Sequence, residues 1–459
     1  MPSLPIALRP ARELLKRTLT RCPVCHASIP GEVWREGVHP GAVWMRRNCP
    51  THGDSAACLA TDARYYWLAQ GEPGNRCGTA CCASPEGAPG TLGRNAQPSQ
   101  SGKFETLSTC IALIEIVRSC NLSCPACYAG SPLSAHDRPD AEPIEALKSR
   151  IEGVIERKGS IEILQLSGGE PTLHPQFIEL LAWAQAHPRI DYSLINTNGV
   201  RLAQDEGFAQ QLALLAQGRK FQLYLQFDGI EEAAQRELRG ADLRALRVRA
   251  LDRAAAMNLP VTLAMTVTRN NLAQCWPVIA FGLGRPEIHG VTFQPLFTSG
   301  RVPKGQDLAA QRLNTADILT SAIRQSSGQL GPADFTPLPC GDPNCAVIGY
   351  LLRLPGGVRS VGEFVQFEQL QGFLQDKLHY TVEDLVRCGC ETEPLGALLQ
   401  QLELHGGSAF RIMVKPFMDA WTWDQDRIDR CCTHVIREDG TLDSFCRHYS
   451  GFPDLKPTV

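Results

Sequence analysis

The chain has 459 residues, of which 43% are hydrophobic and 20% charged, so it can bury one large core and leave material for smaller flanking domains. Its formal net charge is -3. Because both signs of charge are interspersed, there is no basic stripe or acidic tail, and we expect no nucleic-acid partner.

The cysteines and the N-terminal segment indicate the compartment. Nineteen cysteines, many in CxxC-like groups, indicate metal binding in a reducing compartment rather than a disulfide framework. Arg9, Arg12, Lys16 and Arg17 interrupt the apolar residues that a signal peptide would need. No apolar run approaches membrane-spanning length. We therefore expect a cytoplasmic protein with no transmembrane segment, and contact with a membrane surface is left open.

The first motif lies in a predicted N-terminal module, residues 1–75. Cys22 and Cys25 form a CxxC pair, and Cys49 and His52 form a CxxH pair after a short predicted hairpin. Three thiolates and one imidazole suit tetrahedral zinc. A mononuclear iron of rubredoxin type would tolerate a similar spacing, although a histidine ligand favours zinc. We expect a metal-ribbon module.

A second cysteine group falls in a predicted linker, residues 76–110. Cys77, Cys81, Cys82 and Cys110 could supply four thiolates to an auxiliary iron-sulfur cluster. A Gly/Pro/Ser-rich stretch, residues 83–103, separates the first three from Cys110. An unliganded group of cysteines is the alternative.

The most informative motif is the CxxxCxxC triplet formed by Cys120, Cys124 and Cys127. Three thiolates are one fewer than a 4Fe-4S cube needs, so one iron stays open. S-adenosylmethionine (SAM) can chelate such an iron through its amino and carboxylate groups and receive an electron from the cluster. A zinc loop or three core cysteines is the alternative.

Residues 111–330 alternate short apolar runs with helical patterns, which predicts a parallel sheet covered by helices. In the helix expected at 175–187, Phe177, Leu180, Leu181 and Ala184 have the spacing of one buried face. The expected strands are residues 111–117, 161–166, 192–197, 222–227, 261–267 and 291–296.

Polar residues cluster where these strands end. Gly168, Gly169 and Glu170 follow the second strand about forty residues after the cysteine triplet, and two glycines allow close backbone approach to a ligand. In a parallel barrel, strand ends of this kind meet at one mouth. For each of these polar residues, the alternative to a functional role is an ordinary turn residue at the end of a strand. The other polar residues at the ends of the predicted strands are Gln165, Asn196, Asn198, Gln226, Asp228, Thr266 and Gln294.

The last cysteine group lies in a predicted C-terminal region, residues 331–459. Its five thiols could provide four ligands for a second auxiliary cube, and the spacing does not decide whether Cys431 or Cys432 is a ligand. Full thiolate ligation would leave no open iron, so this cluster would pass electrons or position substrate. The five thiols are Cys340, Cys345, Cys431, Cys432 and Cys446.

Together these motifs resemble the radical SAM superfamily, and within it the 7,8-dihydro-6-hydroxymethylpterin methyltransferase and tetraether lipid synthase group. The resemblance implies an α/β fold, a partial (β/α)6 TIM-type barrel, between the metal ribbon and a C-terminal auxiliary iron-sulfur region. It also implies that the triplet is catalytic and that Gly168, Gly169 and Glu170 bind SAM. Asn198, Gln226 and Asp228 then become expected cofactor or substrate contacts. One departure is Ala126, where the family usually has an aromatic residue.

The resemblance implies reductive cleavage of SAM, hydrogen abstraction from an unactivated carbon, and C-C bond formation on a pterin-like or lipid substrate. A low-potential donor such as flavodoxin or ferredoxin would supply electrons. Within the enzyme class, the alternative is a peptide-modifying maturase. A non-catalytic iron-sulfur electron carrier would explain the cysteines, but not the Gly-Gly-Glu loop or the polar strand ends.

Overall fold

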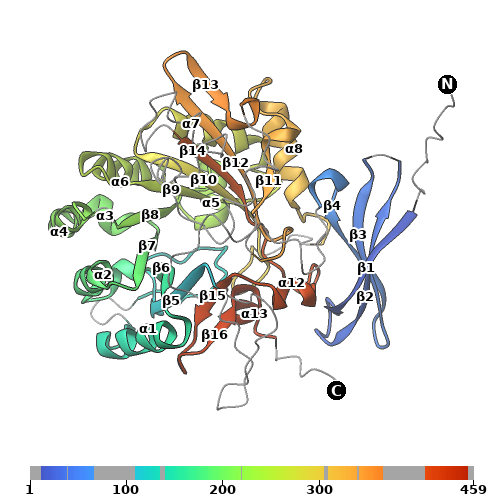
Figure 1. The fold of residues 1–459 in the computed structure, drawn as a ribbon, viewed down its shortest axis with the longest axis horizontal. Coiled ribbons are helices and arrows are strands. Elements are labelled where there is room, and N and C mark those ends of the chain that lie inside the picture. Colours follow the sequence, from blue (N-terminus) through green and yellow to red (C-terminus); the bar gives the residue numbers. More distant parts are fainter. Residues whose placement is uncertain are drawn as a thin grey trace, which may run out of the picture.

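The fold is described from a computed structural model. It covers residues 12–38, 40–66, 109–134, 140–218, 220–303, 309–338, 341–364 and 409–452. Cys77, Cys81, Cys82 and Cys340, on which several of the expectations above rest, lie outside these residues. The described chain contains a small N-terminal sheet and a large sheet with helices packed on it (Figure 1).

The N-terminal sheet is antiparallel, with the order β1-β2-β3-β4. Its strands alternate between buried and exposed positions, as expected for a small sheet with one covered face. Val33, Val43 and Met45 are fully buried in it. The predicted hairpin is therefore part of a four-stranded sheet. The strands are β1 (Arg12–Arg21), β2 (Ser28–Glu36), β3 (Ala42–Cys49) and β4 (Gly53–Ala60).

The centre of the large sheet is a run of six parallel strands in chain order, which confirms the predicted partial barrel. Their near-continuous apolar sequences suit strands that are covered on both faces. The largest boundary difference is at the last strand, which begins at Ile288 rather than Val291. The strands are β5 (Ile111–Val117), β6 (Ile161–Gly168), β7 (Ile190–Thr197), β8 (Phe221–Gln226), β9 (Val261–Val267) and β10 (Ile288–Pro295).

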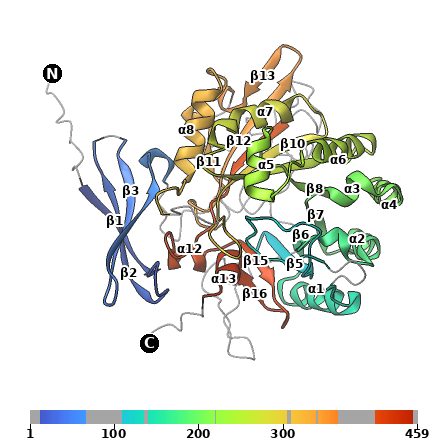
Figure 2. The same ribbon diagram turned by 180° about the vertical axis from the view of Figure 1, so that it is seen from behind.

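Helices between these strands cover the outer side of the sheet (Figures 1 and 2). The expected helix is present as α2 and buries the four predicted positions. The helices are α1 (Ile144–Lys158), α2 (Phe177–Ala186), α3 (Val200–Gln204), α4 (Glu206–Ala216), α5 (Glu232–Arg239), α6 (Arg244–Ala256), α7 (Cys275–Leu283) and α8 (Thr315–Gln325).

The C-terminal region extends the sheet at both edges. β14 (Ala409–Val414) pairs in parallel with β10, and β15 (Thr433–Ile436) pairs in parallel with β5. Both edges of the six-stranded run are thus covered by one stretch of chain, which protects them from pairing elsewhere. The remaining elements are β11 (Thr336–Pro337), β12 (Val347–Leu354), β13 (Gly357–Ser360), β16 (Leu442–Ser444), α12 (Gln425–Asp429) and α13 (Phe445–Ser450).

Residues 415–432 connect these two edges. They leave β14 beside Phe293, near the carboxyl end of β10, and enter β15 beside Ile111, at the beginning of β5. In the described part of the chain the outermost strands, β11 and β16, are not paired with each other. Residues 415–432 therefore run from one edge of the partial barrel to the other.

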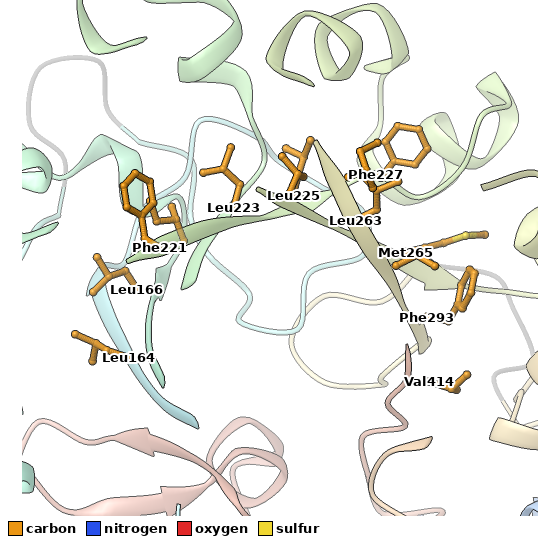
Figure 3. Packing of buried hydrophobic residues seen from close by; sticks show 14 of the residues in the cluster. Leu164, Leu166, Phe221, Leu223, Leu225, Phe227, Leu263, Met265, Phe293 and Val414 are labelled. Atoms are coloured by element: carbon orange, nitrogen blue, oxygen red, sulfur yellow. The ribbon is translucent and has the colours of Figure 1, made fainter. Parts of the chain in front are cut away.

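The main core lies between the sheet and its helices. Figure 3 shows side chains from neighbouring strands packed together, including Leu166 on β6, Leu225 on β8 and Met265 on β9. All three are fully buried. The core thereby holds the strand ends at fixed positions around the barrel mouth. Among the described residues, no helix has the length and apolar character needed to cross a membrane.

Candidate active site

The cysteine triplet lies in the loop after β5, at the carboxyl end of the parallel strands. Cys120, Cys124 and Cys127 all line one cavity of about 130 Å³, together with Gly168, Gly169 and Glu170. Cys120 is buried, and the other two thiols are partly exposed. The fold therefore brings the two motifs that the sequence suggested into one cavity.

Arg301, which sequence reasoning missed, holds this loop in shape. Its Nε donates to the carbonyl of Cys124 at 3.0 Å, and its Nη1 donates to the carbonyl of Ser131 at 2.6 Å. The backbones of Arg301 and Cys127 also exchange two hydrogen bonds of 2.9 Å. Arg301 follows β10, far from the triplet in sequence, so only the folded chain reveals this clamp.

The two glycines have a specific role at the end of β6. Gly168 has φ of 129°, and a Cβ there would overlap the carbonyl oxygen of Val117. A Cβ at Gly169 would overlap the carbonyl oxygen of Ser119. The amide of Gly169 donates to Val117 at 2.8 Å. The glycines thus permit close packing on the chain that leads into the cysteine loop, in addition to lining the cavity.

Glu170 is buried and connects the ends of β6 and β7. Its carboxylate accepts from the hydroxyls of Thr172 at 2.6 Å and Thr197 at 2.7 Å, and from the amide of Asn198 at 2.7 Å. Burial raises the pKa of Glu170 and these donors oppose that effect. Glu170 therefore fixes the relative positions of two cavity loops.

Asn198 links the loop after β7 to the cysteine loop. Its Nδ2 donates to Oδ1 of Asn121 at 2.6 Å and lies 3.7 Å from Sγ of Cys120. Asn196, Gln226, Thr266 and Gln294 line the same cavity. The fold thus brings most of the expected strand-end residues together at the barrel mouth.

Asp228 occupies a different position from the other strand-end residues. It has φ of 65°, is fully buried, and forms bonds of 2.6 and 2.8 Å with Arg239. Burial disfavours its charge, but the Arg239 guanidinium holds the pKa of Asp228 below its usual range. Arg239 itself lines the cavity and donates to the carbonyl of Ala126 at 3.0 Å. Asp228 therefore orients Arg239 instead of lining the cavity.

A second cavity, of about 110 Å³, adjoins the first inside the barrel. The two share Tyr128, Asn196, Gln226, Gln294 and Phe417 in their walls. The second cavity adds further carboxamides, including Gln165 and Gln222, and the cation Lys415. Its far side is lined by the C-terminal thiols.

Four C-terminal cysteines meet at that far side: Cys345, Cys431, Cys432 and Cys446. The amide of Met418 donates to Sγ of Cys446 at 3.3 Å, and Nη2 of Arg427 lies 3.8 Å from Sγ of Cys345. Burial raises the pKa of the Cys446 thiol to about 12. Both Cys431 and Cys432 line the cavity, so the choice between them stays open.

Cys110 lies nearby, with its amide donating to the carbonyl of Cys432 at 2.8 Å. Tyr128, which follows the third triplet cysteine, packs against Phe445 at 5.4 Å and Tyr449 at 4.7 Å between ring centroids. Its ring therefore joins the cysteine loop to α13.

The N-terminal motif forms a separate candidate metal centre. The ligand atoms of Cys22, Cys25, Cys49 and His52 all lie within 4.8 Å of one another. The Sγ atoms of Cys25 and Cys49 are 3.8 Å apart. Two sulfurs bound tetrahedrally to zinc at about 2.3 Å would be about 3.8 Å apart. The hydrogen bond from His52 lowers the pKa of the Cys49 thiol to about 6, which favours the thiolate that binds metal.

The N-terminal sheet is docked on residues 415–432, with α12 beside β1 (Figures 1 and 2). Arg47 donates to the carbonyls of Ala420 at 3.1 Å and Trp421 at 2.7 Å. Lys16 forms a 2.5 Å ion pair with Asp424. The ribbon thereby supports the segment that borders the second cavity.

Two family models match parts of this chain. Residues 114–281 match the radical SAM superfamily, and residues 14–61 match the HMPTM N-terminal zinc ribbon domain. This chain is a radical SAM enzyme, and its cofactors are a 4Fe-4S cluster and S-adenosylmethionine. Its N-terminal sheet is a zinc ribbon of the HMPTM type, which favours zinc over iron.

Among individual relatives, 7,8-dihydro-6-hydroxymethylpterin dimethyltransferase from Methanocaldococcus jannaschii is 23% identical, covering 94% of this chain and 93% of that protein. Mycofactocin maturase MftC from Mycobacterium ulcerans is 30% identical, covering 35% of this chain and 40% of that protein. Streptococcus suis SuiB bound to S-adenosylmethionine aligns with a TM-score of 0.38 and 17% identity, covering 48% of each chain.

Proposed function

We propose that this enzyme abstracts a hydrogen atom from an unactivated carbon of a pterin-like small molecule, which releases 5'-deoxyadenosine, and forms a C-C bond there by methylation. The methyl group would come from a second SAM molecule, which leaves as S-adenosylhomocysteine, and the low-potential donor would supply the one electron that this coupling consumes. The observation that carries the proposal is the pair of adjoining cavities. The thiols of the triplet line the first, a set of carboxamides lines the second, and Asn196, Gln226 and Gln294 belong to both. A substrate in the second cavity would border the cofactor cavity directly.

The protein's own groups have separate tasks. Cys120, Cys124 and Cys127 would hold the cluster, which when bound supplies the electron that cleaves SAM to a 5'-deoxyadenosyl radical. Arg301 and the packed glycines keep the thiol loop in place. Tyr128 and Phe417 wall both cavities with aromatic carbon, which helps to exclude water from a reactive radical.

The lining of the second cavity supports a heterocyclic substrate over an apolar chain. Each carboxamide offers both a donor and an acceptor, which match the edges of a pterin ring. Four of these side chains already donate to neighbouring side chains, and an apolar chain would offer no partner to their remaining hydrogen-bonding capacity, at a cost in binding free energy. The carboxamides are those of Gln165, Asn196, Gln222, Gln226 and Gln294.

The extent of the similarity also supports a pterin-like substrate. The relative named as a pterin dimethyltransferase matches 94% of this chain, including the ribbon and the C-terminal region, whereas the peptide maturase matches 35%. A low-potential flavodoxin or ferredoxin is the electron donor we propose. Four of the five thiols Cys340, Cys345, Cys431, Cys432 and Cys446 would hold an auxiliary cluster that passes electrons or positions substrate.

The test is turnover of the anaerobically reconstituted, reduced protein with SAM and 7,8-dihydro-6-hydroxymethylpterin. We expect 5'-deoxyadenosine and a pterin product heavier by a methyl group, measured by mass spectrometry. The Cys120→Ala/Cys124→Ala/Cys127→Ala variant should form neither. Formation of 5'-deoxyadenosine only with a lipid or a peptide would overturn the substrate assignment, and none under any condition would overturn the proposed chemistry.

A further inference from the structure

Arg411, on β14, is a cation of the second cavity that the site described above does not use. Alternate residues of a strand face the same side of a sheet, and Arg411, Met413 and Lys415 all line this cavity. Residues 411–415 therefore present one face to the barrel interior, with a positive side chain at each end of it.

The two cations lie at different depths in the barrel. Lys415 follows β14 at the mouth, where its amide donates to the carbonyl of Phe293 at 2.9 Å and its Nζ donates to the hydroxyl of Thr433 at 2.7 Å. Arg411 pairs instead with Gly290, near the beginning of β10. Four residues of a strand span about 13 Å. Arg411 thus belongs to the inner end of the cavity, away from the mouth.

The C-terminal thiols lie toward the Lys415 end of this face. Thr433, which accepts from Lys415, donates through its amide to Sγ of Cys431 at 3.4 Å. Thiolates at this site would therefore carry their negative charge near Lys415, whereas Arg411 lies at the other end.

The inner end also offers neutral hydrogen-bonding groups. Gln222 lines the cavity four residues before Gln226, which belongs to both cavities. Burial raises the pKa of Tyr224 to about 12, although Thr292 and the charge of Arg411 oppose the rise, so this phenol is neutral at pH 7. Among the residues that the structure describes, none in the wall of this cavity carries a carboxylate. The inner end thus combines a cation with neutral polar groups.

We propose that Arg411 binds a phosphate group of the substrate, so that the enzyme acts on a pterin-like molecule whose side chain is phosphorylated. This inference rests on the proposed function, since it places the ring among the carboxamides that both cavities share. A guanidinium pairs with phosphate through two parallel hydrogen bonds and keeps its charge at neutral pH. The remaining phosphate oxygens would accept from neutral donors such as the carboxamide of Gln222. On a hydroxymethyl pterin, a phosphate ester extends beyond the ring, which suits a cation set back from the mouth.

The experiment measures the binding of 7,8-dihydro-6-hydroxymethylpterin and of its phosphate ester. Titration calorimetry is done on the anaerobically reconstituted protein with SAM and no reductant, so that no turnover occurs. Hydrogen bonds to charged groups predict that wild type binds the ester about 10- to 100-fold more tightly than the alcohol. Arg411→Met should remove this preference and change the affinity for the alcohol by no more than about twofold, because the alcohol lacks the group that Arg411 contacts. Arg411→Lys should retain part of the preference.

Two further variants locate the phosphate. Lys415→Met removes the other cation of the cavity and should keep the preference for the ester. Loss of the preference in Lys415→Met but not in Arg411→Met would place the phosphate at the mouth and overturn the inference. Arg359→Met, at an exposed position of β13 in the same sheet, is the matched control and should change neither affinity.

Thermal unfolding without ligand separates binding from folding. If Arg411→Met unfolds and a folded Arg411→Lys shows no preference for the ester, Arg411 has a structural role and the inference is overturned. If wild type binds the two pterins equally but still forms 5'-deoxyadenosine and a methylated pterin, this inference fails and the proposed function stands. If wild type binds neither pterin, both fail.

Discussion

Gly168 and Val117 are packed so closely that a Cβ on Gly168 would overlap the carbonyl oxygen of Val117. We predict that Gly168→Ala displaces the loop and destabilises the protein by about 1–3 kcal/mol, because the backbone must move to relieve the overlap. The displacement should also weaken SAM binding. Chemical denaturation and SAM titration check this. Gly356→Ala is the control, since a Cβ there meets no atom within 4 Å; equal effects of both variants would contradict the prediction.

Arg47 should stabilise the docking of the ribbon. It is buried and donates to Thr20 and to two carbonyls of residues 420–421. Arg47→Ala leaves these acceptors unsatisfied, which predicts a loss of about 1–3 kcal/mol in the free energy of unfolding. The neighbouring Arg46 forms an exposed pair with Glu36, so Arg46→Ala should cost less than about 1 kcal/mol. Denaturant titration measures the free energy of unfolding of both variants. A smaller loss for Arg47→Ala than for Arg46→Ala would show that the docking contacts contribute little.

Asp228→Asn should destabilise the protein strongly at neutral pH, by about 3–5 kcal/mol, because Arg239 would remain buried without its counter-ion. The pKa of Asp228 is lowered in the folded protein, so its stabilisation is present above the ordinary carboxyl pKa and is lost as the pH falls through the lower folded value. The difference between wild type and variant should therefore shrink under acid conditions. Denaturation measured from pH 7 downwards would refute this if the difference grew instead.

The ribbon and the catalytic cluster should lose metal independently. Cys22→Ser/Cys25→Ser removes two of four ligands, so the purified protein should lose its zinc and retain its iron. Metal analysis by mass spectrometry measures both elements. The electron paramagnetic resonance signal of the reduced cluster should still respond to SAM. Loss of iron together with zinc would show that the ribbon is needed to assemble the cluster site.

The C-terminal thiols should account for a full cube. Cys345→Ala/Cys446→Ala should lower the iron content by about four atoms per chain relative to wild type, with sulfide falling in parallel. Cys275→Ala, a buried cysteine on α7 away from both cavities, is the control and should change neither. An unchanged iron content would leave the four thiols as an unmetallated group and remove the auxiliary cluster from the proposal.

Much of the fold follows from local sequence patterns. The expected strand 261–267 matches β9 (Val261–Val267), because a run of apolar residues between turn signals has few alternatives in a covered parallel sheet. The pairing of β14 with β10 and of β15 with β5 could not be predicted in this way. Both pairings join residues far apart in the chain, and short apolar strands carry no information about their partners.

The site likewise has features that the sequence predicts and features that only the tertiary structure decides. The spacing of Cys120, Cys124 and Cys127 determined the cluster motif, because thiols three or four residues apart in one loop can reach the same cluster without help from distant parts of the chain. Only the tertiary structure shows that Arg301 is hydrogen-bonded to the cysteine loop and that Asp228 forms an ion pair with Arg239. It alone also shows that Arg247 lies in the cavity wall with no hydrogen-bond partner among the described residues. The physical reason is that ligands close together in the sequence are brought together by the local backbone. The pairing or isolation of a buried charge depends instead on which distant segments the core brings together.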